Sequence, residues 1–104
     1  MEIRKLSIEE MYASIPFVCE VFDKYEAVNY PEDGKNAFKQ AISSKEYLEM
    51  LSAYGAFLDE KLIGIIATRN QGTHVALFFV DGQYHKQGIG RSLFEVILNL
   101  PSGR

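Results

Sequence analysis

Two glycines one residue apart, Gly88 and Gly90, stand between an apolar run that ends at Val80 and an amphipathic stretch. The pattern predicts a buried strand, a short polar turn and the start of a helix. A helix start presents amide donors without intrahelical acceptors, and glycine lets an anion come close to the backbone. Lys86 and Arg91 add positive charge at the rim. Together these residues predict a phosphate-binding site.

Two better-known glycine motifs do not fit this stretch. A P-loop needs four residues between its glycines, followed by Lys and Ser or Thr, and neither feature is present. The dinucleotide fingerprint needs a third glycine where Leu93 stands, and it belongs early in a parallel βαβ chain. The spacing excludes the P-loop, and the missing third glycine together with the preceding predicted hairpins argues against the dinucleotide fingerprint. A module that binds a phosphopeptide or a nucleotide with the same loop stays open as an alternative.

The first half of the chain, about residues 7–52, carries helical signals. Ser7 and Glu10 have the spacing of a capping box, so a helix begins there. Apolar residues then recur at three- and four-residue steps, and Pro16 interrupts them with a missing amide donor. We expect a kink or break over residues 14–16. The neighbouring elements are predicted as a strand over 2–6, a helix end near 25–27, a loop over 29–34, a helix over 35–42, and a short helix through 51 with a second capping box at Ser43 and Glu46.

The second half, about residues 56–100, carries strand signals. Its last strand, residues 74–80, is almost entirely apolar, which is typical of a central strand covered on both faces. The other bounds are predicted as strands over 56–58 and 62–68 joined at 59–61, a turn at 71–72, and a final helix from Gly88 that Pro101 stops. These elements predict one α+β domain over residues 1–104, with two or three N-terminal helices against a mostly antiparallel sheet of four strands and a final helix.

Composition excludes several classes of protein and partner. The 104 residues carry a formal net charge of −3 and no long Lys/Arg run, which argues against a nucleic-acid partner. No run approaches the roughly 18 apolar residues of a membrane span, and no signal segment opens the chain, so we expect a cytoplasmic protein without membrane contact. Cys19 is the only cysteine and lies in an apolar helical stripe, so we predict a buried side chain, with no disulfide and no metal site.

The stretch Val-Asp-x-x-Tyr-x-x-x-Gly-Ile-Gly-Arg-x-Leu, from Val80 to Leu93, follows an apolar strand. It resembles the acetyl-CoA signature of the GNAT superfamily of N-acetyltransferases, which is written Gln/Arg-x-x-Gly-x-Gly/Ala. With the opening strand, the paired helices and the hairpin, the resemblance covers about residues 2–98. It implies a GNAT-like fold and acetyl-CoA as co-substrate. The cofactor-binding residues that it implies are Phe79, Val80, His85, Lys86, Gln87, Gly88, Ile89, Gly90 and Arg91.

The resemblance also assigns roles within this set. The backbone amides from Gln87 to Arg91 would hold the pyrophosphate. Phe79 and Val80 would pair through their backbone with the pantetheine arm, and a strand-end amide would polarise the thioester carbonyl. The implied reaction is acetyl transfer to a primary amine of a small molecule or a protein.

This sequence departs from the family pattern in two places. His85 stands where the signature has Gln or Arg, and a histidine side chain can also donate a hydrogen bond to a phosphate. The chain ends at Arg104, without the further strands and helix that follow in the family, so we expect a C-terminally truncated domain. The alternative function is therefore a catalytically silent module that binds CoA or dimerises, with the exposed edge at residues 78–80 covered by a second copy.

An amine acceptor has to lose a proton, and its free pKa lies near 10. A general base would serve, directly or through a water molecule. Each candidate also has a simpler explanation: a solvated turn residue for the acids, a polar strand end for the histidine, and packing under the loop for Tyr84. The sequence assigns no base among the candidates, which are Glu26, Glu32, Asp33 and His74, with Tyr30 and Tyr84 as possible hydroxyl donors.

Overall fold

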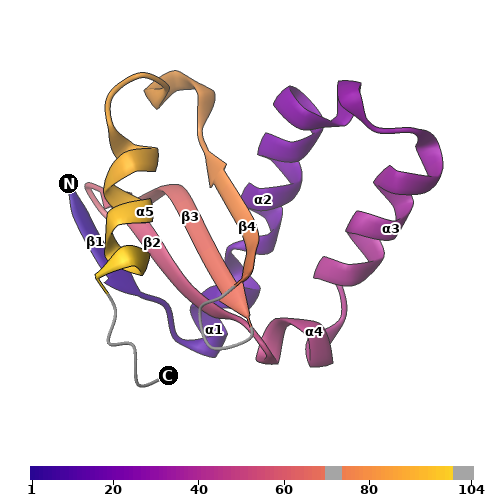
Figure 1. Ribbon diagram of the computed structural model, residues 1–104, viewed down its shortest axis with the longest axis horizontal. Coiled ribbons are helices and arrows are strands. Elements are labelled where there is room, and N and C mark those ends of the chain that lie inside the picture. Colours follow the sequence, from indigo (N-terminus) through magenta and orange to yellow (C-terminus); the bar gives the residue numbers. More distant parts are fainter. Residues whose placement is uncertain (70–73, 100–104) are drawn as a thin grey trace.

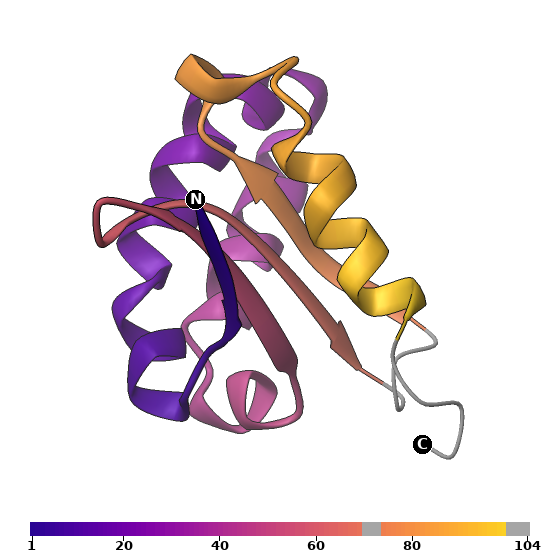
Figure 2. The same ribbon diagram turned by 90° about the vertical axis from the view of Figure 1, so that its left-hand side faces the viewer.

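The computed structural model describes residues 1–69 and 74–99. Within these residues an antiparallel sheet of four strands separates two helical layers (Figures 1 and 2). Four α-helices and two irregular turns cover one face, and the last helix covers the other. The predicted α+β class is confirmed. The strands, in sheet order, are β1 (Glu2–Lys5), β2 (Ser52–Leu58), β3 (Lys61–Arg69) and β4 (His74–Val80).

The first two helices, α1 (Ile8–Ala13) and α2 (Ile15–Val21), meet at the predicted break. The Glu10 amide donates to the Ser7 Oγ atom at 3.1 Å, and the Ser7 amide donates to Glu10 Oε1 at 2.9 Å, which confirms the first capping box. Pro16 lies in the first turn of α2, where a missing amide donor leaves no helical bond unmade.

Beyond α2 the chain stays helical for longer than predicted. A π-helical turn, η1 (Phe22–Glu26), leads into the 3₁₀ turn η2 (Ala27–Asn29). Helix α3 (Glu32–Ile42) then begins three residues before the predicted Lys35, so the expected loop is wrong for residues 32–34. The physical reason is that Pro31 is extended and serves as the N-cap, while the acidic first turn matches the positive end of the helix dipole.

The second predicted capping box is also wrong. Ser44, rather than Ser43, caps α4 (Lys45–Glu49), because the Tyr47 amide donates to the Ser44 Oγ atom at 3.3 Å. The Ser43 hydroxyl instead donates to the Lys39 carbonyl at 2.8 Å and closes the end of α3. With two adjacent serines, either one could be the N-cap of α4. Because the Ser43 hydroxyl is bonded to the end of α3, Ser44 is the residue that caps α4.

Strand β4 lies at the edge of the sheet, so the predicted central position is wrong, and β3 is the strand with the most buried residues. β4 is apolar for another reason. Leu77 and Phe79 are buried under the N-terminal helices, while Phe78 and Val80 lie beside the last helix, α5 (Ile89–Leu98). β2 begins at Ser52, earlier than predicted. The predicted turn at 71–72 and the stop at Pro101 lie outside the described residues.

Two apolar clusters hold the layers together. The larger joins the helices α1 to α4 to the sheet, and the smaller joins α5 to β2 and β3. Gly64 on β3 permits the close approach of α5, because a Cβ atom there would lie 3.1 Å from Leu93 Cδ1 and 3.2 Å from Ile89 Cγ2. The predicted burial of Cys19 is met in part, since its side chain is half-buried against the larger cluster.

The capping box predicts a pH dependence of stability. The hydrogen bond from the Ser7 amide, aided by Arg4, holds the pKa of Glu10 below its ordinary value of 4.5. A carboxylate with a lowered folded-state pKa stabilises the fold above its unfolded pKa, and this contribution is lost as the pH falls through the folded pKa. We expect Glu10→Gln to lower the free energy of unfolding at pH 7 and to have a smaller effect at pH 3.

Urea unfolding of wild type and variant at both pH values measures this difference. Glu49→Gln, at an exposed position on α4, is the matched control and should show no such change. An equal loss of stability in Glu10→Gln at pH 7 and pH 3 contradicts the prediction.

Candidate active site

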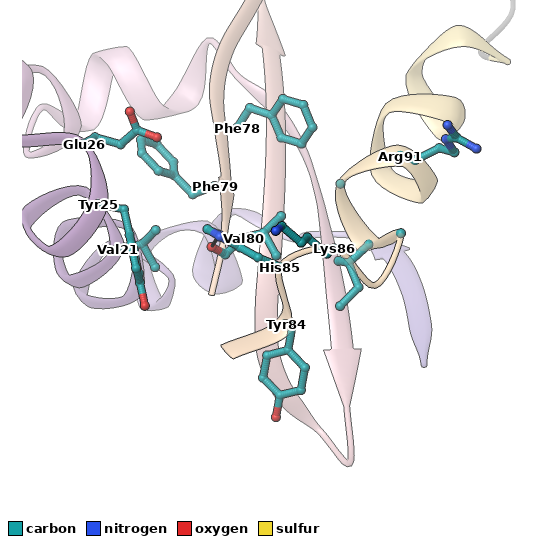
Figure 3. Close-up of a pocket in the computed structure, with 13 residues that line it drawn as sticks. Val21, Tyr25, Glu26, Phe78, Phe79, Val80, Tyr84, His85, Lys86 and Arg91 are labelled. Carbon is teal, nitrogen blue, oxygen red and sulfur yellow. Dashed lines mark hydrogen bonds between the residues drawn. The ribbon is translucent and has the colours of Figure 1, made fainter. Parts of the chain in front are cut away.

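A cavity of about 400 Å³ lies between the helical layer and the segment that joins β4 to α5 (Figure 3). The helical layer contributes a wall from the end of α2 and from η1. The end of β4 forms the floor, and the following loop and the first turn of α5 form the other wall. The lining residues are Val21, Tyr25, Glu26, Phe78, Phe79, Val80, Tyr84, His85, Lys86, Gly88, Ile89, Gly90 and Arg91.

The register of β4 against β3 determines which backbone groups face the cavity. The Asp81 amide donates to the Ile63 carbonyl at 2.8 Å, so the backbone of Asp81 is turned toward β3. Successive residues of a strand turn their backbone groups to opposite sides. The amide and carbonyl of Phe79 therefore also point to β3, whereas those of Phe78 and Val80 point to the open edge.

This register changes one expectation. Of the two residues that the family resemblance assigned to backbone pairing, Val80 faces the edge and Phe79 does not. Phe79 instead packs its side chain into the core and is 9% exposed. Figure 3 shows the side chains of Phe78 and Phe79 on opposite sides of β4. The sequence did not single out the Phe78 backbone, because only the bond from Asp81 to Ile63 shows which backbone groups of β4 face the open edge.

The first turn of α5 leaves backbone donors uncovered. The amide of Ser92 donates to the Gly88 carbonyl at 3.0 Å and is the first amide of this helix with a backbone acceptor. Within the described residues, the amides from Gly88 to Arg91 have no backbone acceptor. Four donors at the positive end of a helix dipole, beside a cavity, match the chemistry of an anion site.

The two glycines serve different purposes. Gly88 is the N-cap of α5 and has a φ of 82°, a left-handed conformation that glycine adopts without strain. Gly90 has ordinary helical geometry, and a Cβ atom there would lie 3.5 Å from Phe78 Cζ and 3.8 Å from Val80 Cγ2. The backbone of this chain does not need glycine at position 90. A side chain would, however, enter the space between α5 and β4.

His85 and Lys86 shape the loop before the helix. The His85 Nε2 atom lies 2.9 Å from the Val80 carbonyl, and because a carbonyl can only accept, Nε2 is the donor. This bond closes the loop onto the end of β4. Lys86 has a φ of 66°, which is uncommon for a residue with a side chain, and such strained residues cluster at binding sites.

Tyr25 connects the helical layer to this loop. Its ring lies 5.3 Å from the His85 ring, centroid to centroid. A Cβ atom on Gly82 would lie 1.9 Å from the Tyr25 hydroxyl, so only glycine allows the tyrosine to pack there. No feature of the sequence pointed to Tyr25 or Val21 as cavity residues, since both follow the apolar helical pattern of the core.

The structure separates the catalytic candidates. Glu26 and Tyr84 line the cavity. Glu32 lies on α3 and pairs with Lys35 at 3.6 Å, and His74 lies at the far end of β4. The candidates that do not line the cavity are Glu32, Asp33, His74 and Tyr30, and of the nine implied cofactor residues only Gln87 does not line it.

Comparison with known proteins decides the family. A family model of the GNAT acetyltransferase domain matches residues 26–101. The chain belongs to this family. The match includes the loop, the two glycines and the start of α5, so the four uncovered amides described above lie inside the GNAT domain. A search of curated proteins found no significant match.

Solved structures of GNAT proteins share the fold. An N-acetyltransferase, PaiA, from Thermoplasma acidophilum in complex with coenzyme A is 26% identical, with a TM-score of 0.73 over 93% of this chain and 71% of that one. Apo YjaB from Escherichia coli is 19% identical, with a TM-score of 0.69 over 93% and 63%. A GCN5-related N-acetyltransferase from Rhodopseudomonas palustris is 15% identical, with a TM-score of 0.76 over 93% and 62%. This GNAT chain therefore spans less than two thirds of two of these three proteins.

Among the described residues, no group of three or more His, Cys, Asp or Glu side chains is placed to hold a metal ion. No helix in the described ranges has the length and apolar character needed to cross a membrane.

The contact between Tyr25 and Gly82 yields a prediction about stability. In Gly82→Ala the new methyl group collides with the tyrosine ring, so we expect a loss of about 1–3 kcal/mol in the free energy of unfolding. Tyr25→Ala removes the colliding ring. In that background Gly82→Ala should cost less than half as much, because contacting residues are not additive.

Urea unfolding of the wild type, the two single variants and the double variant measures the coupling. If the double variant loses as much free energy of unfolding as the two single variants together, the predicted contact between Tyr25 and position 82 is contradicted.

Proposed function

We propose that this GNAT domain transfers an acetyl group from acetyl-CoA to a primary amine. The observation that carries the proposal is the row of uncovered amides from Gly88 to Arg91, which lies beside the open edge of β4 in one cavity. A diphosphate is doubly anionic and fits the positive end of a helix. Lys86 and Arg91 supply further positive charge at the same end of the cavity.

The open edge of β4 suits the rest of the co-substrate. The pantetheine arm carries two amide groups, and an extended amide chain can add to a free strand edge through backbone hydrogen bonds. Phe78 and Val80 present their backbone groups in that direction. The edge-facing amides of Phe78 and Val80 are the two candidate donors to the thioester oxygen.

The reaction that this arrangement supports is direct transfer. The ammonium group of the acceptor first gives up one proton, and the freed nitrogen lone pair forms a bond to the thioester carbonyl carbon. The carbon–sulfur bond then breaks, and the thiolate of CoA leaves and takes up the second proton that the nitrogen loses. An edge-facing amide stabilises the negative charge that develops on the carbonyl oxygen.

A second candidate function rests on a different observation. The open edge of β4 is flanked by partly exposed apolar side chains, with Phe78 41% exposed and Phe94 40% exposed. An apolar free edge is a pairing surface. In this alternative, the chain is a catalytically silent module whose β4 edge is covered by a second copy. Sedimentation with and without CoA separates the two functions, since an obligate dimer that ignores CoA favours the second.

Substitutions at Gly90 test the binding mode of the first function. In Gly90→Leu a branched side chain fills the space between α5 and β4, and we expect the affinity for CoA to fall at least about 10-fold, or about 1.4 kcal/mol. Gly90→Ala is the matched control, since its Cβ atom makes ordinary contacts and the family signature also contains alanine there. Alanine also favours the helix by up to about 1 kcal/mol.

Calorimetric titration with CoA measures the affinities, and thermal unfolding confirms that both variants fold. The proposal fails if Gly90→Leu binds CoA as tightly as the wild type, or if the wild type does not bind CoA. A stronger version combines Gly88→Val with Gly90→Val, which should abolish binding.

A further inference from the structure

The cavity is electrically polarised along its length. Basic side chains, Lys86 and Arg91, lie at the end formed by the loop and α5. Glu26 is the one carboxylate among the thirteen lining residues and comes from the helical layer. Figure 3 shows Glu26 and Arg91 on opposite sides of β4. The two ends therefore suit ligand groups of opposite charge.

Two neighbouring acids are already engaged. Asp23, also on η1, lies 2.8 Å from the Lys39 ammonium nitrogen, and Glu32 lies 3.6 Å from that of Lys35. Glu26 is exposed and takes part in no ion pair among residues 1–69 and 74–99. Its carboxylate is thus available to a cation from solution.

The π-helical turn places Glu26 in the cavity wall. The Ala27 amide donates to the Phe22 carbonyl five residues earlier, so residues five apart lie above one another in this turn. Val21 and Glu26 are five apart, and both line the cavity. In a regular α-helix, with 3.6 residues per turn, the same two side chains would point about 140° apart. The π-helical turn therefore brings Glu26 into the cavity wall beside Val21.

We propose that Glu26 binds the ammonium group of the acceptor and takes its proton, an assignment that rests on the proposed acetyl transfer. A primary amine is an ammonium ion at neutral pH, since its pKa lies near 10. The carboxylate attracts the ion and accepts one proton from it, which frees the nitrogen lone pair for attack on the thioester. The same charge repels acceptors with a carboxylate beside the amine. The acceptor class is therefore an alkylamine or polyamine rather than an amino acid.

A binding experiment tests this assignment without relying on turnover. The probe is spermidine, titrated into the CoA-saturated, ¹⁵N-labelled protein, and the amide signals of Tyr25 and Glu26 are followed by NMR. We expect these signals to shift, and Glu26→Gln to weaken spermidine binding about 5-fold, the upper range for an exposed ion pair. β-Alanine, which carries a carboxylate, should bind more weakly than spermidine to the wild type. In Glu26→Gln the affinities for spermidine and β-alanine should lie closer together than in the wild type.

Glu20→Gln is the matched control, because Glu20 is an exposed glutamate on the neighbouring helix α2 and does not line the cavity. It should bind spermidine like the wild type. The inference is overturned if Glu26→Gln binds spermidine as tightly as the wild type, or if the wild type does not bind it. CoA titration separates the two proposals: a wild type that does not bind CoA refutes the acetyl-transfer proposal, whereas unchanged CoA affinity with unchanged spermidine affinity refutes only the role of Glu26.

Discussion

Backbone groups of a β-strand must point alternately to its two sides, and this constraint shapes the whole site. β3 takes the backbone groups of Asp81 and Phe79, so those of Phe78 and Val80 are left at the edge. A few residues later the start of α5 leaves four more amides without backbone acceptors in the described structure. Both sets of donors open on the same cavity. In the function proposed above, the main chain therefore supplies most of the binding groups, and the side chains mainly hold that main chain in place.

The loop between these two sets of donors is supported from both helical layers. His85 ties it to the end of β4, and Tyr25 packs on it from the N-terminal layer. On the other side, α5 lies close against β3 because Gly64 has no side chain. A binding surface made of amides needs this kind of support, since main-chain donors can be aimed only by fixing the loop that carries them.

Local signals in the sequence predicted much of this architecture. The capping box at Ser7, the break before Pro16 and the glycine pair at the start of α5 each depend on residues close in sequence, and all three are found where expected. The errors arose where a neighbouring element decides the outcome. Whether Ser43 or Ser44 caps α4 depends on how α3 ends. Whether β4 is central or at the edge depends on which strands the sheet contains, and an apolar run looks the same in both positions.

The cavity wall from the helical layer could not have been predicted by the same means. Tyr25 and Glu26 follow an ordinary helical pattern. No residue type in this stretch predicts that the backbone hydrogen bond to the Phe22 carbonyl comes from an amide five residues later instead of four. Sequence reasoning could name Glu26 as an acid near the first loop, but not its direction. The choice among Glu26, Glu32 and His74 therefore needed coordinates.

The π turn at η1 amounts to one extra residue inserted into a helix. Loss of a single residue from this stretch would restore α-helical hydrogen bonding. Every side chain on one side of the deletion would then rotate by about 100° relative to the other. The acid would leave the cavity while the sheet and the glycine loop stayed as they are. Under the proposals made above, selectivity for the acceptor would therefore depend on the length of a helix, whereas cofactor binding would depend on the main chain of a separate loop.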